Sequence, residues 1–101
     1  AASSTDPAMR SLLVSLLGDP DPQVAAAAAT AVAAPGRDAV VDPLSRALEH
    51  ESPRVRMAAL RGLGRVGTPR ALQALQAAAV ASPDPTIRRH AQAELRKRAS
   101  P

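Results

Sequence analysis

Residues 51–67, with the sequence ESPRVRMAALRGLGRVG, contain the pattern that decides the fold, because weaker copies of it occur on both sides. Ser52 stands where a helix N-cap is expected, and Pro53 suits the first helical residue, whose N–H has no partner within a helix. Apolar residues then follow at helical spacing, and Gly67 is placed as the glycine that commonly ends a helix. The stretch therefore predicts a helix over residues 53–66.

The same pattern recurs 31 residues earlier and 32 residues later, so that Val24, Val55 and Ile87 occupy equivalent positions. The alanines within these helices keep the same register: Ala28, Ala59 and Ala91. A period of this length is typical of stacked helical repeats, in which each unit buries its apolar face against the next. We therefore expect an all-α chain, an α-solenoid of three antiparallel helix pairs (six helices) with right-handed stacking.

The three repeat units are expected at about residues 6–34, 37–66 and 68–98, within one domain of residues 6–99. Residues 1–5 are small and polar without periodicity, so we interpret them as a disordered tail or linker, and residues 100–101 as a tail. The first residue is Ala rather than Met, which we interpret as a sign that the chain is a piece of a longer protein.

Each unit is predicted to begin with an outer helix. In the first unit the apolar stripe consists of Met9, Leu12, Leu13, Leu16 and Leu17. In the second unit Pro43 lies inside the apolar pattern, so we expect a kink or a late helix start near Asp42. In the third unit the side chains expected to face inward are those of Leu72, Leu75, Ala79 and Val80.

The composition excludes several kinds of chemistry. The chain has no aromatic residue and no cysteine, so disulfides, thiolate catalysis and cysteine-ligated metals are ruled out. Apolar burial must come from aliphatic side chains and many alanines, which bury little area but let helices approach closely. No apolar run approaches the roughly 18 residues that a membrane span needs. We expect a cytoplasmic protein, or a periplasmic one if the first residue is a processed N-terminus.

These residues carry a resemblance to a known family. The Val55-Arg56 pair, Leu63-Gly64 and the following sequence GTPRAL at residues 67–72 resemble a HEAT repeat, most closely the short HEAT-like class named after phycobilisome lyases. The resemblance implies a concave side lined by the helices that begin at Pro22, Pro53 and Pro85, with the other helices on the convex side. The arginine of the Val-Arg pair is kept as Arg88 in the third unit but is replaced by Ala25 in the first.

Candidates for catalysis are few. His50 falls in a predicted turn, and His90 lies on a predicted helix with Glu94 four residues later, a spacing more typical of a solvated surface pair than of an acid–base site. Gly62 and Gly64 lie inside a helix with no strand before them, which favours close helix packing over a phosphate-binding loop. We therefore expect no catalytic residue, no metal and no cofactor.

Basic residues gather on the helices expected to line the concave side. Arg54, Arg61 and Arg65 form one stripe by helical spacing, joined through the repeat register by Lys97. A solvated face explains such a stripe as well as an acidic binding partner does. The partner-binding candidates are Arg54, Arg61, Arg65, Arg89 and Lys97.

Two other arginines are expected to be structural. Arg56 and Arg88 lie in the first turn of their helices, where the helix dipole disfavours positive charge. We therefore expect them to bond carboxylates or carbonyls in the turns, with Glu51, Asp21 and Asp84 as acceptors.

The favoured function is a non-catalytic scaffold of bacterial type that binds an acidic or extended protein partner on its concave face. One alternative is a subunit or domain associated with a lyase or another enzyme, as the family resemblance implies. Another is weak binding to the backbone of duplex nucleic acid through the arginine stripe, although the lack of aromatic residues disfavours single strands.

The two ends of the array differ in polarity. The last predicted helix is polar all round, as expected of a repeat that caps an array. The first helix carries more apolar surface than one neighbouring helix can bury. We therefore expect the N-terminal end to pack on preceding repeats or on a second copy of the chain.

Overall fold

The computed structural model describes residues 7–99, and no strand occurs among them. Its helices are α1 (Pro7–Leu16), α2 (Pro22–Val32), α3 (Val41–Ala47), α4 (Pro53–Val66), α5 (Pro69–Ala81) and α6 (Pro85–Ala99). A short 3₁₀ turn, η2 (Asp38–Val40), precedes α3. The predicted six helices of an all-α solenoid are confirmed. The expected tails at residues 1–5 and 100–101 lie outside the described residues.

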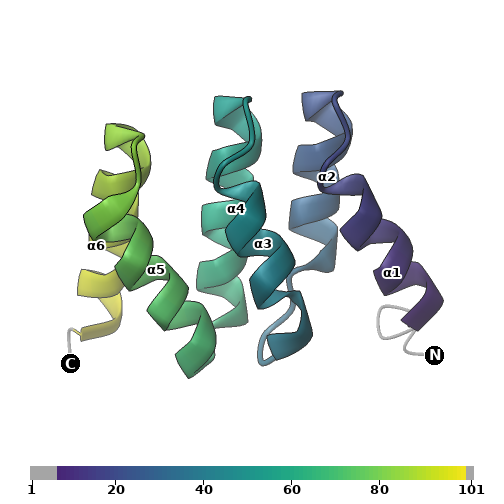
Figure 1. Ribbon diagram of the computed structural model, residues 1–101. Helices are drawn as coiled ribbons and strands as arrows, with labels where there is room; N and C mark the ends of the chain where they lie inside the picture. The colour runs from purple at the N-terminus through teal and green to yellow at the C-terminus, as the bar shows by residue number, and fades with distance from the viewer. Residues whose placement is uncertain (1–6, 100–101) are drawn as a thin grey trace.

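The helices form two layers of three (Figure 1). The outer layer contains α1, α3 and α5, and the inner layer contains α2, α4 and α6, each packed antiparallel to the outer helix that precedes it. Turns of only three to five residues connect the two helices of each pair, which leaves the chain no room for another arrangement.

Prolines set the start of each inner helix. Pro22, Pro53 and Pro85 are the first helical residues, as the sequence predicts. Asp21 caps α2 by accepting a hydrogen bond from the backbone N–H of Gln23. Ser52 stands at the N-cap of α4 but makes no side-chain cap bond. Gly67 ends α4 in the left-handed conformation with φ of 66°, which a glycine adopts without steric cost.

The second outer helix starts late, as expected from its proline. The chain first makes the η2 turn, and α3 begins at Val41, so that Pro43 lies in the first turn of the helix. The backbone nitrogens of this turn have no acceptor within the helix, so the missing N–H of proline costs no hydrogen bond there. The resulting helix has seven residues, fewer than any other α-helix within residues 7–99.

The prediction that Val80 faces inward is wrong, because its side chain is 82% exposed. Its equivalents, five residues before the proline of the next inner helix, are Leu17, which is buried, and Leu48, which is half-buried. Both lie just beyond the last helical residue, where the chain turns back over the core. The turn between α5 and α6 is shorter, with residues 82–84 only, so Val80 remains within α5 on its outer side.

The core is continuous through all three helix pairs and consists of aliphatic residues and alanines. No polar or charged side chain is buried among residues 7–99. Gly62 lets α4 pack closely on α3 and on the end of α2: a Cβ at Gly62 would lie 3.3 Å from the Cβ of Ala33 and from Leu44. Close packing, rather than phosphate binding, therefore accounts for the glycines of α4.

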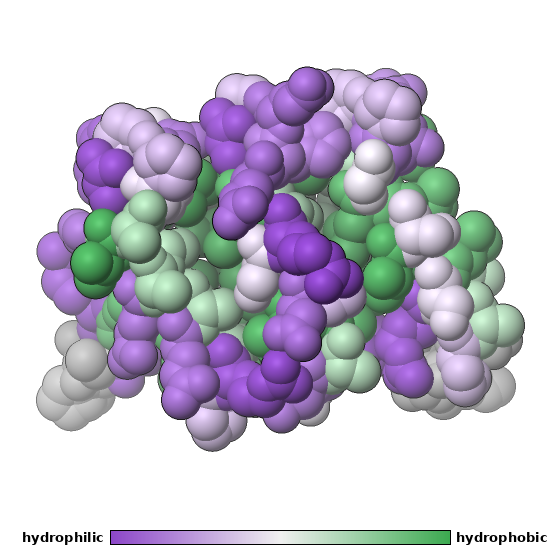
Figure 2. Space-filling view, viewed as in Figure 1, coloured by the Kyte–Doolittle hydropathy of each residue, from purple (hydrophilic) through white to green (hydrophobic). Residues whose placement is uncertain are grey.

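The outer layer is more open than the inner one. A groove of about 200 Å³ lies between α1 and α3, and another of about 260 Å³ lies between α3 and α5. In the view of the outer face, apolar surface shows on both sides of a polar ridge over α3 (Figure 2). The inner helices therefore pack more closely against one another than the outer ones, which leave grooves between them.

Candidate interaction surfaces

Three arginines form a stripe along α4, which we call the arginine stripe: Arg54, Arg61 and Arg65. All three are exposed, and none makes a hydrogen bond or ion pair with the described residues. At 100° per residue their side chains leave the helix within about 40° of one another, and they span about 16 Å along its axis. They therefore present three unpaired positive charges to one side of the helix.

The neighbours of α4 show which side this is. Gly62 faces α2 and α3, where it meets Ala33 and Leu44, and Gly64 faces α6, where it meets Glu94. Buried apolar side chains occupy the face that turns toward the outer layer. The remaining face of α4 is the centre of the inner surface, and helical spacing places the arginine stripe there.

The flanking inner helices contribute less charge to this surface. The repeat register puts Gln23 and Thr30 on α2 beside the stripe, and Thr86 and Ala93 on α6, all without charge. Lys97 is exposed, and its Nζ lies 3.4 Å from Oε2 of Glu94 in an ion pair three residues apart. Glu94 is the one acidic residue on the three inner helices. The inner surface is therefore basic, with its charge concentrated on α4.

Arg89 does not belong to the stripe. It lies 32 residues after Met57, which is half-buried and packs against the core on the flank of α4 that faces α6, about 60° around the helix from Arg54. In α6 the equivalent position is exposed, because no described helix follows α6. Arg89 therefore lies at the C-terminal end of the array, together with Arg96, two turns farther along the same side of α6.

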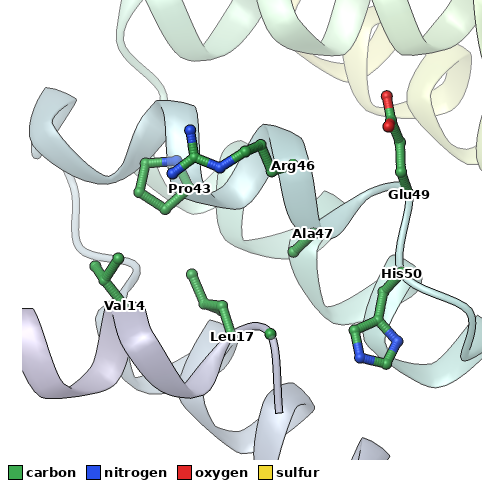
Figure 3. Close-up of a pocket in the computed structure, with 8 residues that line it drawn as sticks. Val14, Leu17, Pro43, Arg46, Ala47, Glu49 and His50 are labelled. Atoms are coloured by element: carbon green, nitrogen blue, oxygen red, sulfur yellow. The ribbon is translucent and has the colours of Figure 1, made fainter. Parts of the chain in front are cut away.

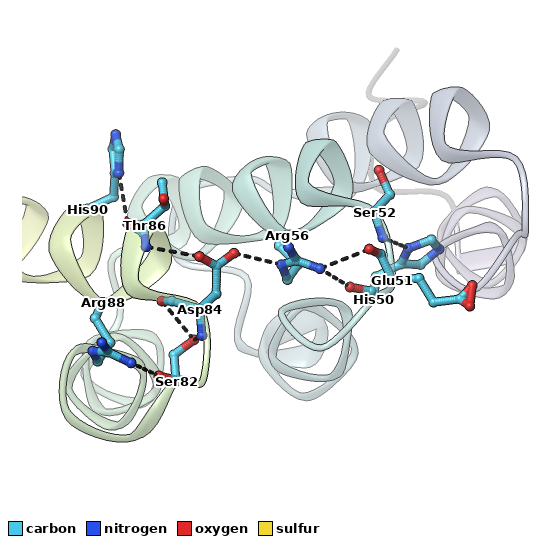
Figure 4. A network of polar contacts seen from close by, with 9 residues as sticks. All are labelled: His50, Glu51, Ser52, Arg56, Ser82, Asp84, Thr86, Arg88 and His90. Atoms are coloured by element: carbon cyan, nitrogen blue, oxygen red, sulfur yellow. Dashed lines mark hydrogen bonds and ion pairs between the residues drawn. The ribbon is translucent and has the colours of Figure 1, made fainter.

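The turn arginine Arg56 joins the second helix pair to the third (Figure 4). Its Nε donates to Oδ2 of Asp84 over 2.8 Å, and its Nη1 donates to the carbonyl oxygens of His50 at 2.7 Å and Glu51 at 3.0 Å. Both members of the ion pair are about one-fifth exposed. One guanidinium group thus holds the turn before α4 against the turn before α6.

The contact with Arg56 stabilises the ionised form of the Asp84 carboxyl. The hydrogen bond from Arg56 lowers the pKa of the Asp84 carboxyl below its ordinary value of 3.8, and bonds from the backbone of Thr86 and Ile87 act in the same direction. Partial desolvation of the carboxylate opposes these contacts and raises the pKa, but less strongly. The net shift means that folding favours the ionised form of this aspartate.

The other expected turn contacts are local. Nη1 of Arg88 donates to the carbonyl oxygen of Ser82 within its own helix pair, over 2.6 Å. Asp21 caps α2, and the residue at the arginine position of that unit is Ala25, so no equivalent bond forms there. Glu51 contributes its backbone carbonyl to Arg56.

His50 makes the corresponding link between the first and second helix pairs. The backbone N–H of Ser52 donates to its Nδ1 at 3.0 Å, so Nε2 carries the proton and donates to the carbonyl oxygen of Asp19 at 3.1 Å. No local sequence pattern predicts this contact, because Asp19 lies 31 residues earlier in the chain. His90 instead contacts the carbonyl oxygen of Thr86, one turn back in α6, over 2.9 Å rather than pairing with Glu94.

Polar side chains of α6 also tie it to its neighbours. The guanidinium of Arg98 donates to the carbonyl oxygen of Gly64 in α4. The amide of Gln92 donates to the carbonyl oxygen of Ala79 in α5 over 3.0 Å. The polar character of the last helix therefore serves packing within the array as well as contact with solvent.

The outer groove between α1 and α3 is mainly apolar (Figure 3). Val14 and Leu17 form one wall, and Pro43 and Ala47 form the other. Arg46 and Glu49 lie at its rim, on the side of α3 and the following turn. This groove has the size of one large aliphatic side chain.

The N-terminal end of the array exposes apolar side chains. Met9 is 48% exposed and Leu12 is 53% exposed. Val14 faces the groove toward α3, and Leu12 lies 200° from it around the helix, so Leu12 points away from the rest of the array. In the second helix pair, Val40 occupies the position of Met9 and Pro43 that of Leu12. There the first helix pair packs over these two residues.

Among residues 7–99, no group of three His, Asp or Glu side chains comes together as metal ligands would. None of the described helices has the combination of length and apolar character that a membrane span requires.

The sequence matches the family of HEAT repeats over residues 2–96, nearly the whole chain. The chain belongs to the HEAT repeat family. Searches of curated proteins and of solved structures found no match. HEAT repeats commonly mediate contacts between proteins, and the helix pairs described above are the stacked units of this HEAT repeat array.

Proposed function

We propose that this HEAT repeat array is a non-catalytic interaction module whose inner surface binds an acidic segment of a protein partner. The observation that carries the proposal is the arginine stripe: three guanidinium groups on one face of α4, exposed and without a partner among the described residues. Arginine forms strong paired hydrogen bonds with carboxylates, so an acidic segment is the ligand that such a surface fits.

The distribution of acids supports the same proposal. On the outer layer Arg70 pairs with Asp42, and in the first turn of α4 Arg56 pairs with Asp84 in the turn before α6. Arg54, Arg61 and Arg65 have no such neighbour, and their mutual repulsion is relieved only by solvent ions or by a bound anion. Three unpaired charges on one face of α4 thus favour attraction of an acidic partner to the inner surface.

A labelled glutamate-rich peptide tests this function by fluorescence anisotropy at low ionic strength. The variant Arg54→Gln/Arg61→Gln/Arg65→Gln should bind it at least tenfold more weakly than the unmodified chain. The matched control is Arg10→Gln/Arg46→Gln/Arg70→Gln, which removes the same charge from the outer layer and should retain most of the affinity. Equal weakening in both variants would show that only net charge matters and would reject the inner surface as the site.

Duplex DNA of the same length in the same assay separates a protein partner from nucleic acid. We expect weaker binding to the duplex than to the peptide. Tight duplex binding that falls steeply with salt and depends on the arginine stripe would instead support phosphate-backbone contacts.

We also propose that the N-terminal end of the array is a second contact surface, and that its occupant is a second copy of the chain. Met9 and Leu12 are exposed there, whereas Val40, at the position of Met9, is fully buried within the array. The C-terminal end presents Arg89 and Arg96, so head-to-tail stacking would leave buried charges without partners. Two N-terminal ends related by a two-fold axis avoid this.

Sedimentation velocity over a wide concentration range tests the self-association. We expect a weak dimer, because the apolar patch is small compared with stable interfaces. The variant Met9→Gln/Leu12→Gln should be monomeric, and Val80→Gln, which removes an exposed apolar side chain at the other end, should behave like the unmodified chain. A chain that stays monomeric at the highest concentrations would rule out this contact.

A further inference from the structure

The direction of the arginine stripe defines how a partner lies on the inner surface. The three charges follow the axis of α4, whereas the equivalent positions on α2 and α6 are mostly uncharged. A partner that crossed all three inner helices would meet guanidinium groups at only one of them. A partner that runs along α4 would meet all three, so the stripe favours alignment with the helix axes.

The spacing of the stripe favours a helical partner. Arg54, Arg61 and Arg65 are separated by seven and four residues, or about 10.5 Å and 6 Å of axial rise. A second α-helix reproduces both spacings on one face with carboxylates seven and four residues apart. An extended strand rises about 3.3 Å per residue, so it matches 6 Å with two residues and 10.5 Å with three. Three residues reverse the face of a strand, which turns one carboxylate away.

We propose that the partner of the inner surface is an acidic α-helix that lies along α4 and presents three carboxylates on one face, with gaps of seven and four residues when parallel to α4 or four and seven when antiparallel. This inference rests on the proposed function, since it concerns the same arginines. It adds the secondary structure of the partner and its orientation.

The surface around the stripe has room for a helix. Ala58 lies between Arg54 and Arg61 along α4 and is half-buried; on the neighbouring inner helices Ala27 and Thr30 are exposed and Ala93 is half-buried. Helices approach to about 8–10 Å when small side chains lie at the contact. The long arginine side chains rise from the same surface on α4 and can reach carboxylates on a helix docked there.

Three alanine-based helical peptides of identical composition test the inference. The first two carry Glu at gaps of seven and four residues and of four and seven. The third carries Glu at gaps of five and six, which keeps the end-to-end distance but turns the middle carboxylate by about 100–160° around the helix relative to the first two. We expect one of the first two to bind about two- to fivefold more tightly than the third at low salt, as one exposed ion pair allows.

Single variants of the chain locate the source of this preference. Arg61→Gln should remove the difference between matched and mismatched peptides, because Arg61 faces the middle carboxylate. Arg54→Gln and Arg65→Gln should weaken all three peptides alike and leave the difference in place.

The possible outcomes separate this inference from the proposed function. Equal affinities for all three helical peptides, each lowered by loss of the stripe, would overturn the helical partner while leaving the acidic one standing. Tighter binding of a flexible glutamate–glycine peptide than of any helical one would overturn it as well. Absence of binding to every acidic peptide would reject both proposals together.

Discussion

The two joints between neighbouring helix pairs use the same repeat register but different interactions. At the first joint, α2 meets α4 through small apolar groups, with the Cβ position of Gly62 3.3 Å from that of Ala33. At the second joint, α6 meets α4 through polar groups: a Cβ at Gly64 would lie 3.0 Å from Oε1 of Glu94, and Arg98 donates to the carbonyl oxygen of Gly64. At the start of α4, Arg56 also donates to Asp84 in the turn before α6.

This difference shows that a repeat register specifies where units meet but not what holds them together. Apolar close packing depends on shape and is indifferent to salt, whereas the bonds of the second joint include a charge pair that salt and acid weaken. The joints should therefore respond differently to substitution and to solution conditions.

The largest effect is expected at Ala59, which lies in α4, the helix shared by both joints, and is fully buried. The substitution Ala59→Leu adds side-chain volume where no cavity exists, so the free energy of unfolding should fall by about 1–3 kcal/mol. Urea unfolding followed by circular dichroism measures this. Ala27→Leu, at an exposed position of α2, is the control and should change stability little. An unaffected Ala59→Leu protein would mean that this face of α4 is not packed.

At the second joint, the largest loss of stability is expected from substitution of Arg56. Replacement of Arg56 by Met keeps much of the aliphatic stem but removes the bonds to Asp84 and to the carbonyls of His50 and Glu51. We expect a loss of about 1–2 kcal/mol, since hydrogen bonds that involve a charged group contribute more than neutral ones. Arg70→Met removes the exposed pair with Asp42 and should cost much less. Similar losses for the two variants would contradict the bridging role of Arg56.

The glycines of α4 allow a direct comparison of the joints. Alanine is favoured over glycine inside a helix by about 1 kcal/mol. At Gly64 the new methyl group meets the flexible Glu94 side chain, which can move, so Gly64→Ala should be neutral or stabilising. At Gly62 it meets Ala33, which cannot move without its helix, so Gly62→Ala should be the less stable variant by about 0.5–1 kcal/mol. Equal stabilities would mean that the first joint is no tighter than the second.

The smallest change in the free energy of unfolding is expected when the pH is lowered. Folding lowers the pKa of Asp84, so its stabilising contribution is fully present above the ordinary value of 3.8 and is lost as pH falls through the lower, folded-state value. Asp84→Asn should therefore reduce the slope of stability against pH below about pH 4. Arg56→Met should reduce it too, because the bond from Arg56 is the largest cause of the shift. Urea midpoints between pH 6 and pH 2 provide the test, and identical slopes in all three proteins would contradict it.

Much of the fold follows from local sequence signals. The prolines at positions 22, 53 and 85 predicted the starts of the inner helices, and Pro43 predicted the late start of α3, because proline acts on the backbone of its own turn. The exposure of Val80 was not predicted, since it depends on a turn that is two residues shorter than its counterparts. The length of this turn can be determined only after the ends of α5 and α6 are known.

The candidate site was predictable to a similar extent. Helical spacing alone places Arg54, Arg61 and Arg65 on one face. Arg89 was also a predicted partner-binding residue, and the structure puts it at the C-terminal end of the array. The contact of His50 with the carbonyl of Asp19 depends on how two helix pairs sit against each other, and no local pattern reports this. Whether the arginine stripe binds a partner remains the proposal that the peptide experiments decide.

The short helix α3 has a consequence for how the array holds together. Seven residues are too few for a helix to persist in water by itself, since isolated helices shorter than about 12–15 residues are marginal. In a linear array, total stability is the sum of what each unit has intrinsically and what each interface adds. The central unit therefore contributes little intrinsic stability and depends on its interfaces, with Val40, Val41 and Leu44 buried against its neighbours. An array with a weak centre and strong interfaces melts as one cooperative body rather than unit by unit from its ends.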